Sequence, residues 1–188
     1  MMRGEDSHAV GSGETLSRMS WSRILRAIVL LPGAMTVLLP ALVLYLGEGP
    51  DVGFGLPLPL ALAVALIGVA LIVQGLALMI RTITLFARVG RGTLAPWDPT
   101  ERLVVLGPYL HVRNPMISGV LSVLLGEGLA LGSAAILVAA GIFFAVNAIY
   151  IPLVEEPGLS ERFGDDYRAY RRNVPRWIPR LRPWVPDV

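Results

Sequence analysis

Residues 116–154 read MISGVLSVLLGEGLALGSAAILVAAGIFFAVNAIYIPLV and contain a single charged side chain, Glu127. A helix needs about 20 apolar residues to cross a bilayer, so this run is too long for one crossing. The Gly-Ser pair at 132–133 lies near its middle, and such a pair favours a turn. The stretch therefore predicts a tight hairpin of two membrane helices.

Two further apolar runs precede this hairpin. Residues 24–46 form the first, in which Pro32 and Pro40 are expected to kink the helix. Residues 56–80 form the second, and their helical pattern continues to Ala87. Hydrophobic residues make up 54% of the chain and the mean hydropathy is +0.64, which is typical of membrane proteins. We predict an all-α integral membrane bundle of four transmembrane helices plus a short cytoplasmic C-terminal helix.

The distribution of arginine predicts which ends of the helices face the cytoplasm. All sixteen basic residues are arginines, and none lies in the turns at 47–55 or 131–134. They lie in the N-terminal region, the 81–113 connector and the C-terminal segment, so the positive-inside rule places those parts and both termini in the cytoplasm. We divide the chain into a disordered cytoplasmic tail (1–20), a four-span membrane domain (21–154) and a cytoplasmic segment that completes a site (155–188).

The segment just before the third span carries polar side chains. Asn114 precedes Pro115 and suits the N-cap position, while proline suits the first position of a helix. A helix N-terminus attracts anions, and His111 and Arg113 add donors immediately before it. These residues predict a small cradle for a carboxylate or phosphate at the edge of the apolar layer.

Two acids, Glu155 and Glu156, follow the fourth span, and Pro157 is expected to end the helix there. A helix C-terminus is partially negative, so acids are unfavourable at this position. They either mark the end of the membrane segment or bind a cationic or hydroxylated ligand. Because adjacent helical residues point about 100° apart, only one is expected to face a ligand directly.

Residues 165–171 fit a short helix that begins at Asp165 and Asp166, with Tyr167, Tyr170 and Arg171 on one face. Two interpretations stay open: an amphipathic helix on anionic headgroups, or a flap over the cradle. Trp177 and Trp184 are expected to be interfacial anchors.

The order and spacing of several motifs resemble the isoprenylcysteine carboxyl methyltransferase family, within the wider phospholipid methyltransferase-like membrane enzymes. The resemblance covers about residues 100–178. The motifs are Gly107-Pro108-Tyr109, Arg113-Asn114-Pro115, Gly119, Glu155-Glu156, Phe163-Gly164, Tyr167, Tyr170 and Val174-Pro175-Arg176. This chain departs from the family at Asn114, where histidine is usual, at Ile117, where tyrosine is common, and at Ile151, where eukaryotic members have a substrate-binding arginine.

The resemblance implies S-adenosylmethionine binding between the last two spans and the C-terminal segment. By matching positions it places these residues around the cofactor: Leu103, Val104, Tyr109, Asn114, Pro115, Met116, Ile117 and Glu155. We add the polar neighbours His111, Arg113, Glu156, Tyr167, Tyr170 and Arg171 as candidates. Glu155 and His111 are the candidates for a general base, should the acceptor release a proton.

Methyl transfer needs neither a metal nor a covalent enzyme intermediate, which suits a chain with no cysteine and two histidines. We expect a lipophilic or membrane-partitioned acceptor, no metal and no nucleic-acid partner, and the sequence leaves the oligomeric state open. Two alternatives are a membrane NADPH-dependent reductase of the sterol-reductase kind and a non-catalytic membrane scaffold or small transporter. Titration with S-adenosylhomocysteine and with NADPH separates the three.

Overall fold

The computed structural model describes residues 29–47, 49–90 and 103–185, and within these segments every regular element is a helix. The all-α prediction is therefore confirmed for the described part of the chain. In chain order the elements are η1 (Val29–Leu38), α2 (Leu39–Leu46), α3 (Leu58–Leu85), η2 (Phe86–Gly90), η3 (Gly107–Leu110), α4 (Pro115–Leu131), α5 (Ala134–Tyr150), η4 (Ile151–Glu155) and α6 (Glu156–Asn173).

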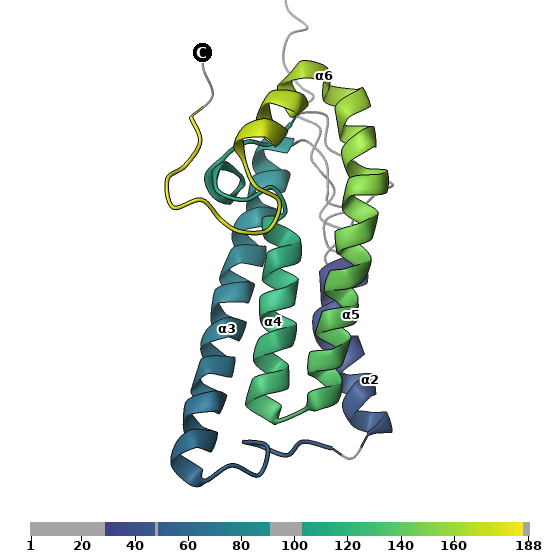
Figure 1. Cartoon of the computed structure of the whole chain (residues 1–188). Helices are drawn as coiled ribbons and strands as arrows, with labels where there is room; N and C mark the ends of the chain where they lie inside the picture. Colours follow the sequence, from purple (N-terminus) through teal and green to yellow (C-terminus); the bar gives the residue numbers. More distant parts are fainter. Residues whose placement is uncertain (1–28, 48, 91–102, 186–188) are drawn as a thin grey trace, which may run out of the picture.

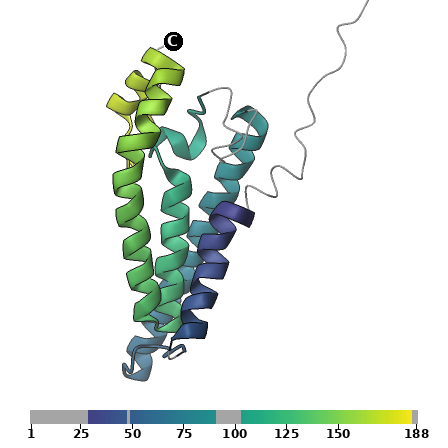
Figure 2. The ribbon, with the colours of Figure 1, turned by 90° about the vertical axis from the view of Figure 1, so that its right-hand side faces the viewer.

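The long helices lie side by side as a bundle, with successive helices running in opposite directions (Figures 1 and 2). One end of the bundle holds the turn before α3 and the turn between α4 and α5. The other end holds η3, α6 and the C-terminal segment. This second end brings together the polar motifs that lie far apart in the sequence.

Helices α3 and α4 approach closely because glycines face each other across their contact. A Cβ atom at Gly126 would lie 2.5 Å from the carbonyl oxygen of Gly68, and one at Gly75 would lie 2.6 Å from that of Gly119. Small residues at such contacts let helix backbones pack tightly, which is common between membrane helices.

The predicted hairpin turn lies where the sequence placed it. Gly132 has a φ of 65°, in the left-handed region that favours glycine at a helix C-terminus. Ser133 is the N-cap of α5, and its hydroxyl accepts a hydrogen bond from the Ile136 amide at 3.4 Å. The Gly-Ser pair thus ends one helix and begins the next.

The two N-terminal runs are also helical where they are described. Residues 24–28 of the first run lie outside the described residues, and the rest form η1 and α2, with Pro32 inside a π-helical segment. The second run forms α3, which extends to Leu85 and passes into η2. The predicted continuation past residue 80 is therefore confirmed.

Two helical stretches, Leu58–Leu85 and the apolar part of Ala134–Asn173, are long and apolar enough to cross a membrane. Pro32–Leu46 and Pro115–Leu131 are apolar but shorter. Many apolar side chains on the outer faces of α2, α3 and α5 are exposed, as expected for helices that face lipid. Crossing by all four segments stays a prediction.

The prediction that Pro157 ends the helix is wrong. Pro157 lies in the first turn of α6, and the path from α5 through η4 into α6 is helical throughout. The break occurs later, at Gly164, whose φ of 55° and ψ of −129° are not helical. The short C-terminal helix predicted to begin at Asp165 is thus the second half of α6.

Candidate site at the basic end of the bundle

Helix α4 begins at Pro115, as the sequence predicted, with Asn114 at the N-cap position. The Asn114 side chain does not cap the helix, so that part of the prediction is wrong. Its Nδ2 atom instead lies 3.5 Å from the carbonyl oxygen of Arg176, which accepts its hydrogen bond. The Asn114 carbonyl accepts from both the amide and the hydroxyl of Ser118 at 3.0 Å. The amide side chain is directed to another segment of the chain.

That segment is residues 174–185, here named the C-terminal strap, which crosses the residues leading into α4. Three backbone hydrogen bonds of 2.9 Å hold it there: Arg113 N to Pro175 O, Arg180 N to His111 O, and Trp184 N to Leu110 O. No periodic pattern in the sequence predicts this pairing, because its partners lie about 60–75 residues apart. The segment expected to complete the site, residues 155–188, includes this strap, but no strap residue is among the candidate site residues.

The His111 ring is also held by the strap. Its Nδ1 atom lies 2.7 Å from the carbonyl oxygen of Arg180. A carbonyl oxygen only accepts hydrogen bonds, so Nδ1 carries the proton and, in the neutral ring, Nε2 is the basic nitrogen. The contact therefore fixes both the ring orientation and the tautomer.

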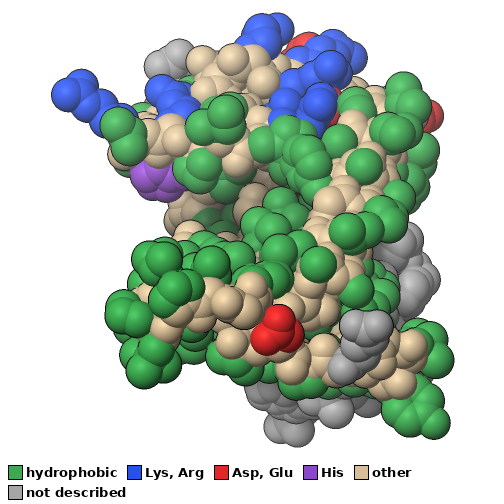
Figure 3. Space-filling view, turned by 60° about the horizontal axis from the view of Figure 1, so that its bottom comes forward, with side chains coloured by type: hydrophobic (Ala, Val, Ile, Leu, Met, Phe, Trp, Pro, Cys, Tyr) green, Lys and Arg blue, Asp and Glu red, His purple; other side chains and the backbone are tan. Residues whose placement is uncertain are grey.

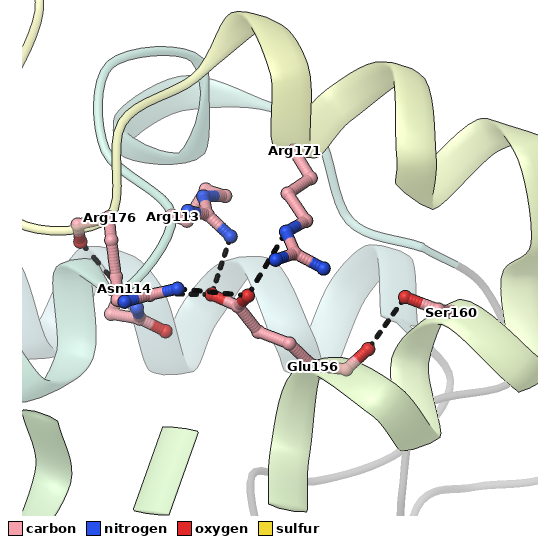
Figure 4. A network of polar contacts seen from close by, with 6 residues as sticks. All are labelled: Arg113, Asn114, Glu156, Ser160, Arg171 and Arg176. Atoms are coloured by element: carbon pink, nitrogen blue, oxygen red, sulfur yellow. Dashed lines mark hydrogen bonds and ion pairs between the residues drawn. The ribbon is translucent and has the colours of Figure 1, made fainter. Parts of the chain in front are cut away.

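A buried carboxylate forms the centre of the polar cluster (Figure 4). Glu156 is 1% exposed, and its oxygens accept from Arg113 Nη1 at 2.6 Å, Arg176 Nε at 2.7 Å and Arg176 Nη2 at 3.0 Å. The Nε atom of Arg171, whose side chain is 51% exposed, lies 3.2 Å away. One side chain thus ties together the residues before α4, both halves of α6 and the C-terminal strap.

The charges in this cluster do not balance. Burial alone would raise the pKa of Glu156, but the hydrogen bond from Arg176 and the charges of Arg113, Arg176 and Arg171 outweigh it and lower the pKa. The carboxylate is therefore ionised, and three positive charges meet one negative charge, an excess of two. Arg113 is only 9% exposed, and its Nε has no hydrogen-bond partner in the described structure. Such a cluster is suited to an additional anionic group.

An aromatic cluster lies beside the arginines. Tyr109, Tyr167 and Tyr170 are all buried, and the Tyr170 hydroxyl donates to the backbone carbonyl of Tyr109 at 2.8 Å. Burial raises the pKa of Tyr170 above its usual range, so the hydroxyl stays protonated. Val104 is buried in the same cluster, with Leu103 packed against it. The tyrosine face of α6 covers residues 103–109, which favours the flap interpretation over a helix that only lies on headgroups.

The two adjacent glutamates face different surroundings. The side chain of Glu156 is buried and points into the arginine cluster. The preceding turn, Ile151–Glu155, is π-helical, and one π-turn shifts the side-chain register by about one residue. Glu155 is exposed and makes no ion pair within the described residues. Its contact with a cofactor stays a prediction.

The remaining candidates divide between the site and the core. Pro115 is fully buried, Met116 packs in the bundle core with Met79 and Val120, and Ile117 is half-buried. Trp184 packs against Tyr170, with ring centroids 6.0 Å apart. The structure thus gathers the polar and aromatic candidates at one end of the bundle and directs Met116 into the bundle interior.

The helices of the bundle expose apolar side chains on their outer faces, and a polar cluster is buried at one end. This is the arrangement expected of a membrane protein whose site lies near the membrane surface. Comparison with protein-family models finds phospholipid methyltransferase over residues 63–166, more than half of the chain. The chain belongs to this family, which includes the membrane methyltransferases that its motifs resemble, and it is accordingly a membrane methyltransferase. No curated protein and no solved structure matches it.

Proposed function

We propose that the chain transfers a methyl group from S-adenosylmethionine to a lipophilic or membrane-partitioned acceptor, at the end of the bundle where α4 begins. The observation that carries this proposal is the extent of the family match. Residues 63–166 include the segment before α4 and the Glu155-Glu156 pair, and the fold joins these two parts directly through the 2.6 Å contact between Arg113 and Glu156.

The residues present fit the charges of this cofactor. Its carboxylate suits the arginine cluster, which has excess positive charge and an unpartnered Nε on Arg113. Its cationic ammonium or sulfonium group suits Glu155, whose carboxylate no described arginine occupies. Leu103, Val104 and Tyr109 offer an apolar and aromatic surface for the adenosine part. When bound, the cofactor supplies an electrophilic methyl group.

The protein's contribution is to orient the reactants and to exclude water. The tyrosine face of α6 and the C-terminal strap cover the segment before α4 and limit its exposure. For an acceptor that loses a proton, the neutral His111 ring presents a basic Nε2, because Nδ1 donates to Arg180. Glu155 is the second candidate for this role.

The site belongs on the cytoplasmic side in this proposal. The C-terminal arginines gather at the end of the bundle that contains α6, while the two turns at the opposite end carry none. The positive-inside rule then places both termini and the site in the cytoplasm, where the cofactor is made, with four spans crossing the membrane. The acceptor enters laterally from the bilayer.

Calorimetric titration of the full chain in nanodiscs tests the proposal. We expect S-adenosylhomocysteine to bind, NADPH not to bind, and methyl label from S-adenosylmethionine to appear in an extracted membrane lipid fraction. Binding of NADPH without S-adenosylhomocysteine would favour a reductase. Binding of neither would overturn the cofactor assignment.

A further inference from the structure

The C-terminal strap exposes three large aliphatic side chains at the polar end of the molecule. Leu181 is 98% exposed, Ile178 81% and Val185 74%. Leu181 is the most exposed large hydrophobic residue in the described part of the chain. Unlike the exposed side chains of α2, α3 and α5, these three lie outside the helices of the bundle. Apolar side chains gathered on a surface in this way mark a contact with a partner or a membrane.

The exposure of these side chains is fixed by the fold. The strap is held at Pro175, Arg180 and Trp184 by the three backbone hydrogen bonds to the residues before α4. The Trp184 ring also packs against Tyr170. Ile178 and Leu181 lie between these fixed points, and Val185 follows the last of them.

The charge of this segment complements an anionic surface. Residues 167–186 contain no acidic residue, and Arg180 and Arg182 alternate with the exposed aliphatic positions. Arg182 is exposed. Figure 3 shows arginine side chains gathered at this end of the molecule, with hydrophobic side chains among them and the single described histidine beside them. Basic and aliphatic side chains intermixed in this manner fit the boundary between headgroups and acyl chains.

The strap is continuous with the apolar outer face of the bundle. Trp177 packs edge-on against Phe144 of α5, with ring centroids 5.2 Å apart. Phe144 lies among the exposed side chains of α5, including Val146 and Ile149. The strap therefore contacts a lipid-facing helix as well as the residues before α4, so its outer side adjoins the bilayer surface.

We propose that the C-terminal strap docks into the anionic leaflet on its side of the membrane. Ile178, Leu181 and Val185 insert at the boundary between headgroups and acyl chains, and Arg182 binds lipid phosphates. This surface is separate from the buried arginine cluster, and the proposal does not depend on methyl transfer. The same strap holds the His111 ring and the Arg113 backbone, so docking fixes the candidate site relative to the leaflet.

Site-specific fluorescence tests this proposal on the full chain. The protein has no cysteine, so Leu181→Cys gives one labelling position, and Asp166→Cys, exposed on α6, is the matched control. Each labelled variant is placed in nanodiscs that contain lipids with a nitroxide quencher near the headgroup, and iodide serves as the aqueous quencher. We expect nitroxide lipids to quench the label at 181 several-fold more than the control, and iodide to quench it less.

The lipid composition identifies the partner. With docking as proposed, nitroxide quenching at 181 increases when an anionic lipid is added to zwitterionic nanodiscs, and Arg182→Gln removes most of this increase. Equal iodide access at 181 and 166 would overturn insertion. Quenching that does not change with the anionic lipid, or an increase that Arg182→Gln leaves intact, would overturn the assignment to anionic lipid.

Discussion

Replacing Glu156 by glutamine is expected to destabilise the protein strongly, because it removes the negative charge that pairs with three arginines. The glutamine has nearly the same shape and keeps one oxygen that can accept a hydrogen bond. Its NH2 group, however, would face guanidinium donors that need an acceptor. Arg113 and Arg176, 9% and 25% exposed, would lose most of their compensation.

The size of the expected destabilisation follows from the burial of the Glu156 ion pairs. Removing one partner of a buried ion pair costs about 3–5 kcal/mol, because the remaining charge is left uncompensated. The contact with Arg171 adds less than about 1 kcal/mol, since that side chain is half-exposed. Because glutamine keeps one acceptor, we expect about 3 kcal/mol. For a chain of this size that corresponds to a melting temperature lower by about 6–12 °C.

Thermal melts in detergent measure this effect, with Glu161→Gln on the exposed face of α6 as the matched control. The double variant Glu156→Gln with Arg113→Gln should recover part of the loss, because it removes one uncompensated charge. A Glu156→Gln melting temperature within about 2 °C of the wild type would refute the claim that this carboxylate holds the end of the bundle together.

The pH dependence gives a second readout of the same group. The pKa of Glu156 is lower in the folded state than its ordinary value of 4.5. Its stabilisation is therefore fully present above pH 4.5 and is lost as the pH falls through the folded pKa. Glu156→Gln should remove this contribution below pH 4.5, so stability in the variant should fall less steeply there. Parallel curves for the two proteins would contradict the assignment.

Three further outcomes are expected. Glu155→Gln should weaken S-adenosylhomocysteine binding by about ten- to a hundredfold with little change in melting temperature, since a charge-assisted contact is worth about 1.5–3 kcal/mol; unchanged calorimetric affinity would exclude this role. Gly126→Ala should destabilise the bundle by about 1–3 kcal/mol, because its methyl group meets the backbone of α3, whereas Gly141→Ala, which meets nothing within 4 Å, should be nearly neutral in the same melts. Reporter fusions at Gly49 should be exported and fusions at Gly92 internal; the reverse would contradict a cytoplasmic site.

The helices could be predicted because their signals are local. The long apolar run with a Gly-Ser pair predicts a hairpin from length and turn chemistry, and the turn lies at Gly132 and Ser133. The Asn114-Pro115 step likewise predicts a helix start from backbone restriction alone. Each of these features depends on residues within a few positions of one another.

The interior of the site could not be predicted in the same way. The partners of Glu156 lie 43, 15 and 20 positions away at Arg113, Arg171 and Arg176, and no periodicity links them. The π-turn before Glu156 shifts the side-chain register, so an ordinary helical projection does not tell which glutamate faces inward. The sequence predicts a helix end at Pro157, although proline is also well suited to a helix's first turn, where it lies in α6. These outcomes depend on tertiary contacts.

The arrangement of the two glutamates bears on what kind of ligand the site can hold. A carboxylate that already pairs with Arg113, Arg176 and Arg171 cannot also neutralise a cationic ligand without losing one of them. A cation at this end of the bundle therefore needs a different acid, and Glu155 is adjacent while remaining outside the arginine cluster. The excess positive charge around Glu156 favours an anion at nearly the same place. We infer that the two acids divide these tasks, so the site favours a ligand that carries both charges close together, as the amino-acid end of S-adenosylmethionine does.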